Sequence, residues 1–176
     1  LLAQAFEVLA RDIKPPAIAA RCCAELAEAA GALALVGGQV DDLGGEFTDG
    51  NVTRLEEIHR RKTGAMFLVS LRLGGLVAEA DDPQQQGLEA YGRSLGLAFQ
   101  IVDDLLDVQG DEAAIGKRTK KDADRGKMTF PSVLGASESR IRAEQLIEAA
   151  CQAVAPIGPR AAHLQALARY VLERTH

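Results

Sequence analysis

The sequence predicts an all-α protein built as a helical bundle. Three observations support this prediction: Ala, Leu and Glu are abundant, apolar residues recur at helical rather than alternating spacing, and proline and glycine divide the chain into segments of helical length. At 176 residues, 47% of them hydrophobic, the chain can bury one sizeable core. It carries no internal repeat, low-complexity tract or linker, so residues 1–176 are interpreted as a single domain.

Proline and glycine end three helix-length segments in the first part of the chain. The segments are residues 1–13, 17–30 and 32–43. Their stops are Pro15-Pro16, Gly31 and the Gly44-Gly45 turn.

Capping signals mark two long helices in the middle of the chain. Thr53 and Glu56 have the spacing of a capping box, which predicts a helix that begins at Thr53 and reaches about Ala80. Asp82-Pro83 supplies an N-cap and a first-turn proline for the next helix, which we expect to reach about Val108.

The helical pattern is interrupted once after these helices. Residues 109–127 lack periodicity and are mostly polar, which predicts a long loop of functional character. The pattern returns in three segments, at residues 129–134, 138–155 and 159–174.

Composition argues against several classes of protein. The net charge of −5 and the 4% aromatic content, without Trp, disfavour a nucleic-acid-binding protein. The longest apolar run, residues 64–78, is interrupted by Arg72 and is too short for a membrane span, so it predicts a core helix. Cys22, Cys23 and Cys151 fit neither a disulfide framework nor a zinc spacing, and indicate buried thiols in a reducing, cytoplasmic compartment.

Three carboxylates lie within five residues of an apolar run, at Asp103, Asp104 and Asp107. On a helix, Asp103 and Asp107 lie about 40° apart and Asp104 about 100° from Asp103, so we expect all three on one side, with Gln100 between them. Like charges this close oppose one another's ionisation unless a cation lies among them. Oxygen ligands without nearby His or Cys favour Mg²⁺ or Mn²⁺ over zinc. From the residues alone, a solvated helical face fits the triplet equally well.

A basic segment follows directly after the acidic helix. Residues 116–127 carry six basic and two acidic side chains. Metal ions beside lysine side chains are what a diphosphate group requires, although a solvated basic loop is the alternative. Lys62 and His59 border an apolar run and, taken alone, are interpreted as surface residues. Gln39 and Asp42 lie three residues apart on one helical face.

Several of these residues belong to longer motifs, which occur in a characteristic order. The motifs are Gly38-Gln39-Val40-Asp41-Asp42-Leu43, Lys62-Thr63-Gly64-Ala65, Gly96-Leu97-Ala98-Phe99-Gln100 running into Asp103-Asp104-Leu105-Leu106-Asp107, Gly116-Lys117, and Gly126-Lys127-Met128-Thr129-Phe130-Pro131. With them the chain resembles the trans-isoprenyl diphosphate synthases, most closely the bacterial farnesyl and geranylgeranyl diphosphate synthases. The resemblance covers essentially the whole sequence.

The resemblance implies a fold and a reaction. The expected fold is the all-α bundle of the isoprenoid synthase type around a central cavity, present here as the C-terminal portion, with the N-terminal helices absent from this chain. The expected activity is the Mg²⁺-dependent condensation of an allylic diphosphate with isopentenyl diphosphate, giving a short linear isoprenyl diphosphate such as the farnesyl or geranylgeranyl compound. A cytoplasmic homodimer without a membrane span is expected.

The resemblance also implies roles for individual residues. Catalytic roles fall to Lys62, Thr63 and Gln100. Diphosphate binding falls to Lys62, Lys117 and Lys127. Metal ligation falls to Asp103, Asp107 and Asp122. The cavity would be lined by Gln39, Asp42, Phe99 and Asp104.

One family motif has no counterpart in this sequence. The first aspartate-rich motif of the family is missing, because Asp41-Asp42 and Asp81-Asp82 lack a third aspartate and flanking arginines at the right spacing. We therefore expect the 176 residues alone to be inactive and the functional protein to carry an upstream portion. Two alternatives are a non-catalytic subunit of a heteromeric synthase and a terpene cyclase of the same fold; the Lys62-Thr63 and Gly126-Lys127 motifs fit condensing enzymes better.

Overall fold

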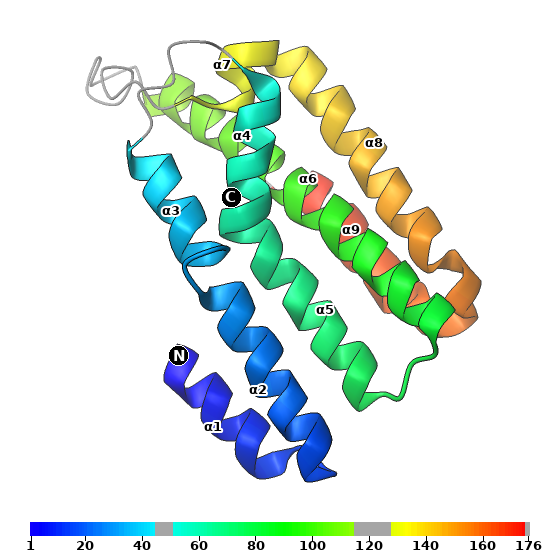
Figure 1. Cartoon of the computed structure of the whole chain (residues 1–176). Coiled ribbons are helices and arrows are strands. Elements are labelled where there is room, and N and C mark those ends of the chain that lie inside the picture. The colour runs from blue at the N-terminus through cyan, green and yellow to red at the C-terminus, as the bar shows by residue number, and fades with distance from the viewer. Residues whose placement is uncertain (45–50, 115–127, 175–176) are drawn as a thin grey trace.

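The longest helix, α6 (Asp82–Ala114), forms the axis of the bundle (Figure 1). The computed structural model describes residues 1–44, 51–114 and 128–174, and all regular structure in these ranges is helical, which confirms the all-α prediction. The other elements are α1 (Leu2–Asp12), α2 (Pro16–Ala30), α3 (Leu35–Gly44), α4 (Val52–His59), the π-helical turn η1 (Arg60–Gly64), α5 (Ala65–Val77), α7 (Phe130–Leu134), α8 (Ala136–Val154), the 3₁₀ segment η3 (Ala155–Ala161) and α9 (Ala162–Glu173).

The apolar face of α6 forms the centre of the core. This helix packs against α5 on one side and α8 on the other, and α2 covers the far side of α5 (Figure 1). Fully buried Tyr91 of α6 donates a hydrogen bond from its hydroxyl to the carbonyl of Leu164 on α9 (2.7 Å). The remaining large buried side chains of the core include Leu55, Leu95, Ile101, Phe130, Ile147 and Val154.

One long helical path, α4–η1–α5, matches the helix predicted from Thr53, but it begins differently. The N-cap is Asn51, whose side chain accepts a hydrogen bond from the backbone N–H of Arg54 (3.2 Å). Thr53 therefore lies inside the first turn, and its predicted capping box is wrong. Asn is at least as good an N-cap as Thr, and the earlier start makes the helix longer.

The start and end of α6 also differ from the prediction. The capping pair is Asp81 and Gln84: Gln84 N–H donates to Asp81 Oδ1 (2.9 Å), and Asp81 N–H donates to Gln84 Oε1 (3.1 Å). The cap thus precedes the predicted Asp82 by one residue. The helix continues past Val108 to Ala114, so the first part of the predicted loop is helical; residues 115–127 lie outside the described ranges.

His59 is buried rather than exposed, so its predicted surface position is wrong. Only 3% of the residue is accessible, and its ring stacks on Phe130 with the centroids 5.6 Å apart. Cys22 and Cys151 are buried free thiols, as predicted, and burial raises the pKa of both, whereas Cys23 is only half-buried. None of the described helices has the length and apolar character of a membrane span.

Candidate functional site

The centre of the candidate site is the π-helical turn η1, which contains Lys62 and Thr63. A π turn inserts a wider loop into a helix, and such turns occur frequently at functional sites. The sequence predicted the helix but not the π turn. The turn is surrounded by α3 and α6, each of which approaches it through a glycine.

Gly38 brings α3 against the backbone of η1. A Cβ built at Gly38 would lie 2.7 Å from Lys62 Cα, a separation that side-chain carbons do not adopt, so only glycine permits this approach. One turn further along α3, Asp42 Oδ2 accepts a hydrogen bond from Lys62 Nζ (2.6 Å). The two side chains are 10% and 24% exposed, so this ion pair is largely shielded from water. The neighbouring residues Asp41 and Arg61 form a second, parallel ion pair.

Gly96 brings α6 against the end of η1. A Cβ at Gly96 would lie 3.0 Å from Gly64 Cα at the end of η1. The close approach places Gln100, one turn later, beside Thr63, whose hydroxyl donates to Gln100 Oε1 (3.0 Å). Gln100 is 9% exposed, and this hydrogen bond satisfies its buried amide oxygen.

The three aspartates of α6 have different surroundings. Asp104 is 4% exposed, and its Oδ2 accepts a hydrogen bond from the backbone N–H of Phe130 at the start of α7 (2.9 Å). It thus anchors α7 to α6, and the expectation that all three carboxylates share one side does not hold for Asp104. Asp107 is exposed, whereas the Asp103 side chain is 47% exposed and lies against Arg174.

Phe99 lies where α6, α5 and the end of α9 meet. Its ring is tilted against Phe67 of α5, with the centroids 5.3 Å apart, and the guanidinium carbon of Arg174 lies 4.1 Å from its centroid. Gln39 is half-buried on α3, in the turn before Asp42. Of the residues predicted from the resemblance, the structure therefore gathers Lys62, Thr63, Gln100 and Asp42 around η1, whereas Phe99 packs on Phe67 of α5 and on Arg174.

Asp103 and Asp107 are the described residues that suit a metal ion at this site. Within the described ranges, no three His, Cys, Asp or Glu side chains cluster as metal ligands. Mg²⁺ does not need such a cluster, because it is usually held by one or two carboxylates together with water and substrate phosphates. Two carboxylates one helical turn apart fit that requirement. The predicted ligand Asp122 and the predicted diphosphate-binding residues Lys117 and Lys127 lie outside the described residues.

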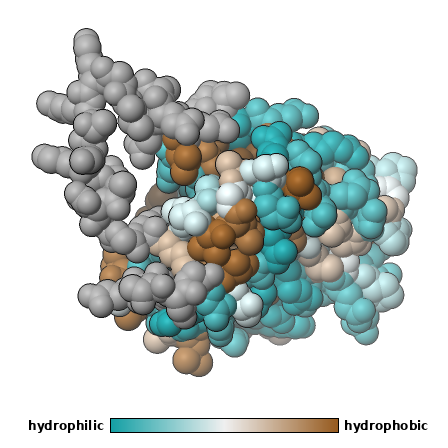
Figure 2. Space-filling model, turned by 90° about the horizontal axis from the view of Figure 1, so that it is seen from above, coloured by the Kyte–Doolittle hydropathy of each residue, from teal (hydrophilic) through white to brown (hydrophobic). Residues whose placement is uncertain are grey.

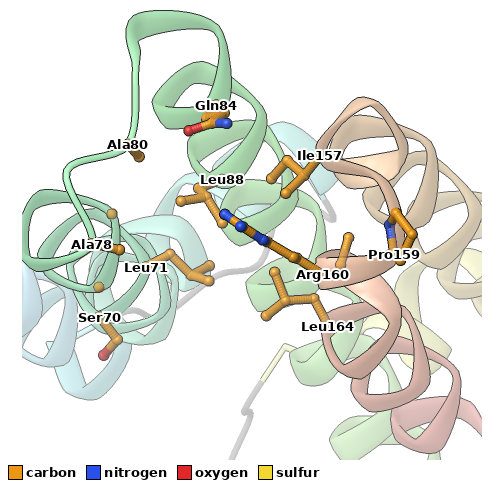
Figure 3. Close-up of a pocket in the computed structure, with 13 residues that line it drawn as sticks. Ser70, Leu71, Ala78, Ala80, Gln84, Leu88, Ile157, Pro159, Arg160 and Leu164 are labelled. Carbon is orange, nitrogen blue, oxygen red and sulfur yellow. The ribbon is translucent and has the colours of Figure 1, made fainter.

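Two apolar hollows lie along α5, one beside Met66 and the other at the end of α5 away from η1. One of about 640 Å³ is lined by α1 and by Leu26, Leu35, Met66 and Leu73, and Met66 lies one turn after Lys62. A second, of about 600 Å³, lies between α5, α6 and the start of α9, and the side chain of Arg160 crosses it (Figure 3). The end of the molecule above these hollows carries apolar side chains flanked by hydrophilic ones (Figure 2).

A family model described as polyprenyl synthetase matches residues 1–159. The chain belongs to the polyprenyl synthetase family. The family expectation drawn from the motifs is thereby confirmed.

Related sequences and structures agree with this assignment. A dimethylallyltranstransferase of Fischerella ambigua is 41% identical, with 100% of this chain and 52% of that protein covered. The farnesyl diphosphate synthase of Escherichia coli is 39% identical, with 97% and 59% covered. The crystal structure of an FPP/GFPP synthase from Zymomonas mobilis superposes with a TM-score of 0.82 at 33% identity, covering 96% of this chain and 57% of that one. The chain thus spans about half the length of these polyprenyl synthetases.

Sequence reasoning missed Arg174 and the pairing of Lys62 with Asp42. Arg174 lies 71 positions from Asp103, and nothing in its local sequence separates it from an ordinary surface arginine. Lys62 and Asp42 both belong to recognised motifs, but their contact depends on the approach at Gly38.

Proposed function

We propose that the chain is the C-terminal part of a prenyltransferase that condenses an allylic diphosphate with isopentenyl diphosphate to a short linear isoprenyl diphosphate, of farnesyl or geranylgeranyl type. The observation that supports this most directly is the arrangement around η1: Lys62 is paired with Asp42, and Thr63 is bonded to Gln100 of α6, the helix that also carries Asp103 and Asp107. An apolar hollow begins one helical turn further along, at Met66. The names of the related synthases agree with this proposal.

The proposed reaction separates charge. The carbon–oxygen bond of the allylic diphosphate breaks, and its electron pair stays with pyrophosphate, leaving an allylic cation. The double bond of isopentenyl diphosphate supplies the electrons of the new carbon–carbon bond, and pyrophosphate accepts the proton that is lost. Catalysis must therefore stabilise an anion and exclude water from a cation.

The residues around η1 meet these needs in different ways. The Lys62 ammonium has three donors, so it can keep its bond to Asp42 and donate another to the leaving pyrophosphate. Because the Thr63 hydroxyl donates its proton to Gln100, the lone pairs of the Thr63 oxygen can face the allylic cation. The apolar side chains below, such as Met66 and Leu73, would hold the hydrocarbon chain away from water.

Asp103 and Asp107, with Asp122, would hold the metal ion. Bound Mg²⁺ or Mn²⁺ would neutralise the non-bridging oxygens of the diphosphate. Lys117 and Lys127 would add further donors to the same group. We also propose a cytoplasmic homodimer, by analogy with the family; size-exclusion chromatography with light scattering tests the dimer.

The test is pyrophosphate release from an allylic diphosphate and isopentenyl diphosphate by the whole chain that the gene encodes. We expect Asp103→Ala to slow the reaction on the order of 10³-fold, because it removes a metal ligand that acts in the transition state. Asp82→Ala, at the exposed far end of α6, is the matched control and should retain full activity. A loss below tenfold in Asp103→Ala would exclude Asp103 from the mechanism.

Product analysis separates the proposal from its alternatives. Linear isoprenyl diphosphates support a condensing enzyme, whereas cyclic hydrocarbons indicate a terpene cyclase. Absence of turnover together with co-purification of a longer homologous chain would indicate a non-catalytic subunit. The 176-residue chain, assayed alone, should release no pyrophosphate.

A further inference from the structure

Arg174, which directly follows α9, contacts Asp103, the first of the three aspartates of α6. Its Nη2 donates to Asp103 Oδ1 (2.8 Å) and to the backbone carbonyl of Phe99 (3.2 Å). The guanidinium also lies over the Phe99 ring, 4.1 Å from the centroid. Ion pair, hydrogen bond and cation–π contact thus fix one cation against one carboxylate.

The environment of Arg174 distinguishes this pair from the exposed ion pairs of the chain. The Arg174 side chain is only 12% exposed, whereas Arg11 and Arg140, in helix-surface pairs, are 62% and 51% exposed. Its Nε is buried and finds no acceptor within the described residues. An unsatisfied buried donor costs free energy, so the contacts to Asp103 and Phe99 must offset that cost to keep the guanidinium in place.

A divalent cation that binds this carboxylate must first displace Arg174, which costs free energy. A metal ion at Asp103 and Asp107 would be repelled by Arg174, whose Nη2 lies 2.8 Å from Asp103 Oδ1, and both cations would compete for the same carboxylate. The Coulomb energy between a unit charge and a divalent ion at such separations is substantial even when it is partly screened by water.

We propose that Arg174 is a positioning residue that holds Asp103 in the metal-free protein and is displaced from it when the divalent cation binds. The guanidinium serves as counter-ion to Asp103 in place of the metal, and it thereby raises the metal concentration at which the site fills. This inference rests on the proposed function, because it assumes the metal site at Asp103.

Metal binding without substrate tests the inference on the whole encoded chain. Mg²⁺ and, separately, Mn²⁺ are titrated by calorimetry and by the shift of the thermal unfolding midpoint, at constant ionic strength. We expect Arg174→Gln to lower the apparent dissociation constant of the metal about three- to tenfold, since it removes the competing charge. The same variant should unfold at a lower temperature in EDTA and regain this loss when metal is added.

Three further variants define the interpretation. Arg174→Lys retains the charge and should bind metal nearly as the wild type does. Arg169→Gln removes an exposed arginine from the same helix and should change nothing. Asp103→Asn should abolish most metal binding at the site. Unchanged or weaker metal binding in Arg174→Gln, with Asp103→Asn still impaired, overturns the inference alone. Unimpaired metal binding in Asp103→Asn overturns both the inference and the proposed metal site.

The wild-type protein provides a second measurement that does not depend on the folding of a variant. Trypsin cleaves after arginine residues whose side chain can enter its specificity pocket. We expect Mg²⁺ to release the Arg174 guanidinium from Asp103 and so to accelerate cleavage after Arg174. Intact mass follows this cleavage. A free arginyl peptide in the same mixture controls for effects of Mg²⁺ on trypsin. An unchanged or slower cleavage after Arg174 contradicts the proposed displacement.

Discussion

Replacing Asp104 by alanine tests whether the two adjacent aspartates of α6 have different functions. The Asp104 carboxylate is buried and accepts a hydrogen bond from the backbone N–H of Phe130, which is itself fully buried. Hydrogen bonds to a charged group contribute about 1.5–3 kcal/mol, and a buried donor left without an acceptor costs about 1–3 kcal/mol. We expect Asp104→Ala to lower the free energy of unfolding by about 2–3 kcal/mol.

Thermal and urea unfolding, followed by far-UV circular dichroism in EDTA, measure this loss. For a chain of this length, about 2–3 kcal/mol corresponds to a fall of about 4–12 °C in the unfolding midpoint. Asp104→Asn keeps an acceptor oxygen of the same shape and should lose less. The exposed Asp107→Ala is the matched control and should remain within about 0.5 kcal/mol of wild type. If Asp104→Ala unfolds at the wild-type temperature, the structural function assigned to this carboxylate is wrong.

Two further predictions concern the helix contacts that surround the site. Burial raises the pKa of the Tyr91 hydroxyl from 10.0 to about 12. Its contribution to the free energy of unfolding is therefore fully present below pH 10.0 and is lost as the pH rises towards 12. Below pH 10, Tyr91→Phe should lower the free energy of unfolding by about 1 kcal/mol, because the hydrogen bond to Leu164 is lost. In urea unfolding at rising pH, the difference in free energy of unfolding between wild type and variant should become smaller. A difference that stays constant would contradict the raised pKa. Gly96→Val should destabilise the chain by about 1–3 kcal/mol in the same assay, because its Cβ would lie 3.0 Å from Gly64 Cα; wild-type stability would show that η1 and α6 can move apart freely.

Much of the site could be found from the sequence because its motifs are local. Lys62-Thr63 and the run from Gln100 to Asp107 each lie on one helix, where spacing along the chain fixes spacing in space. Asp104 is the exception within that run. A rotation of about 100° per residue turned it from the face of Asp103 into the core, and only the packing of α7 against α6 shows which side of the helix is buried.

The sequence by itself determined the helical class, the approximate extent of most helices and the family, because amphipathic periodicity, prolines, glycines and local motifs are properties of neighbouring residues. The tertiary structure alone decided which groups meet. The close approaches at Gly38 and Gly96 bring α3 and α6 against η1, and Arg174, far along the chain, pairs with Asp103. Such contacts join residues far apart in the chain, and their free energy depends on burial and distance, which local spacing does not encode.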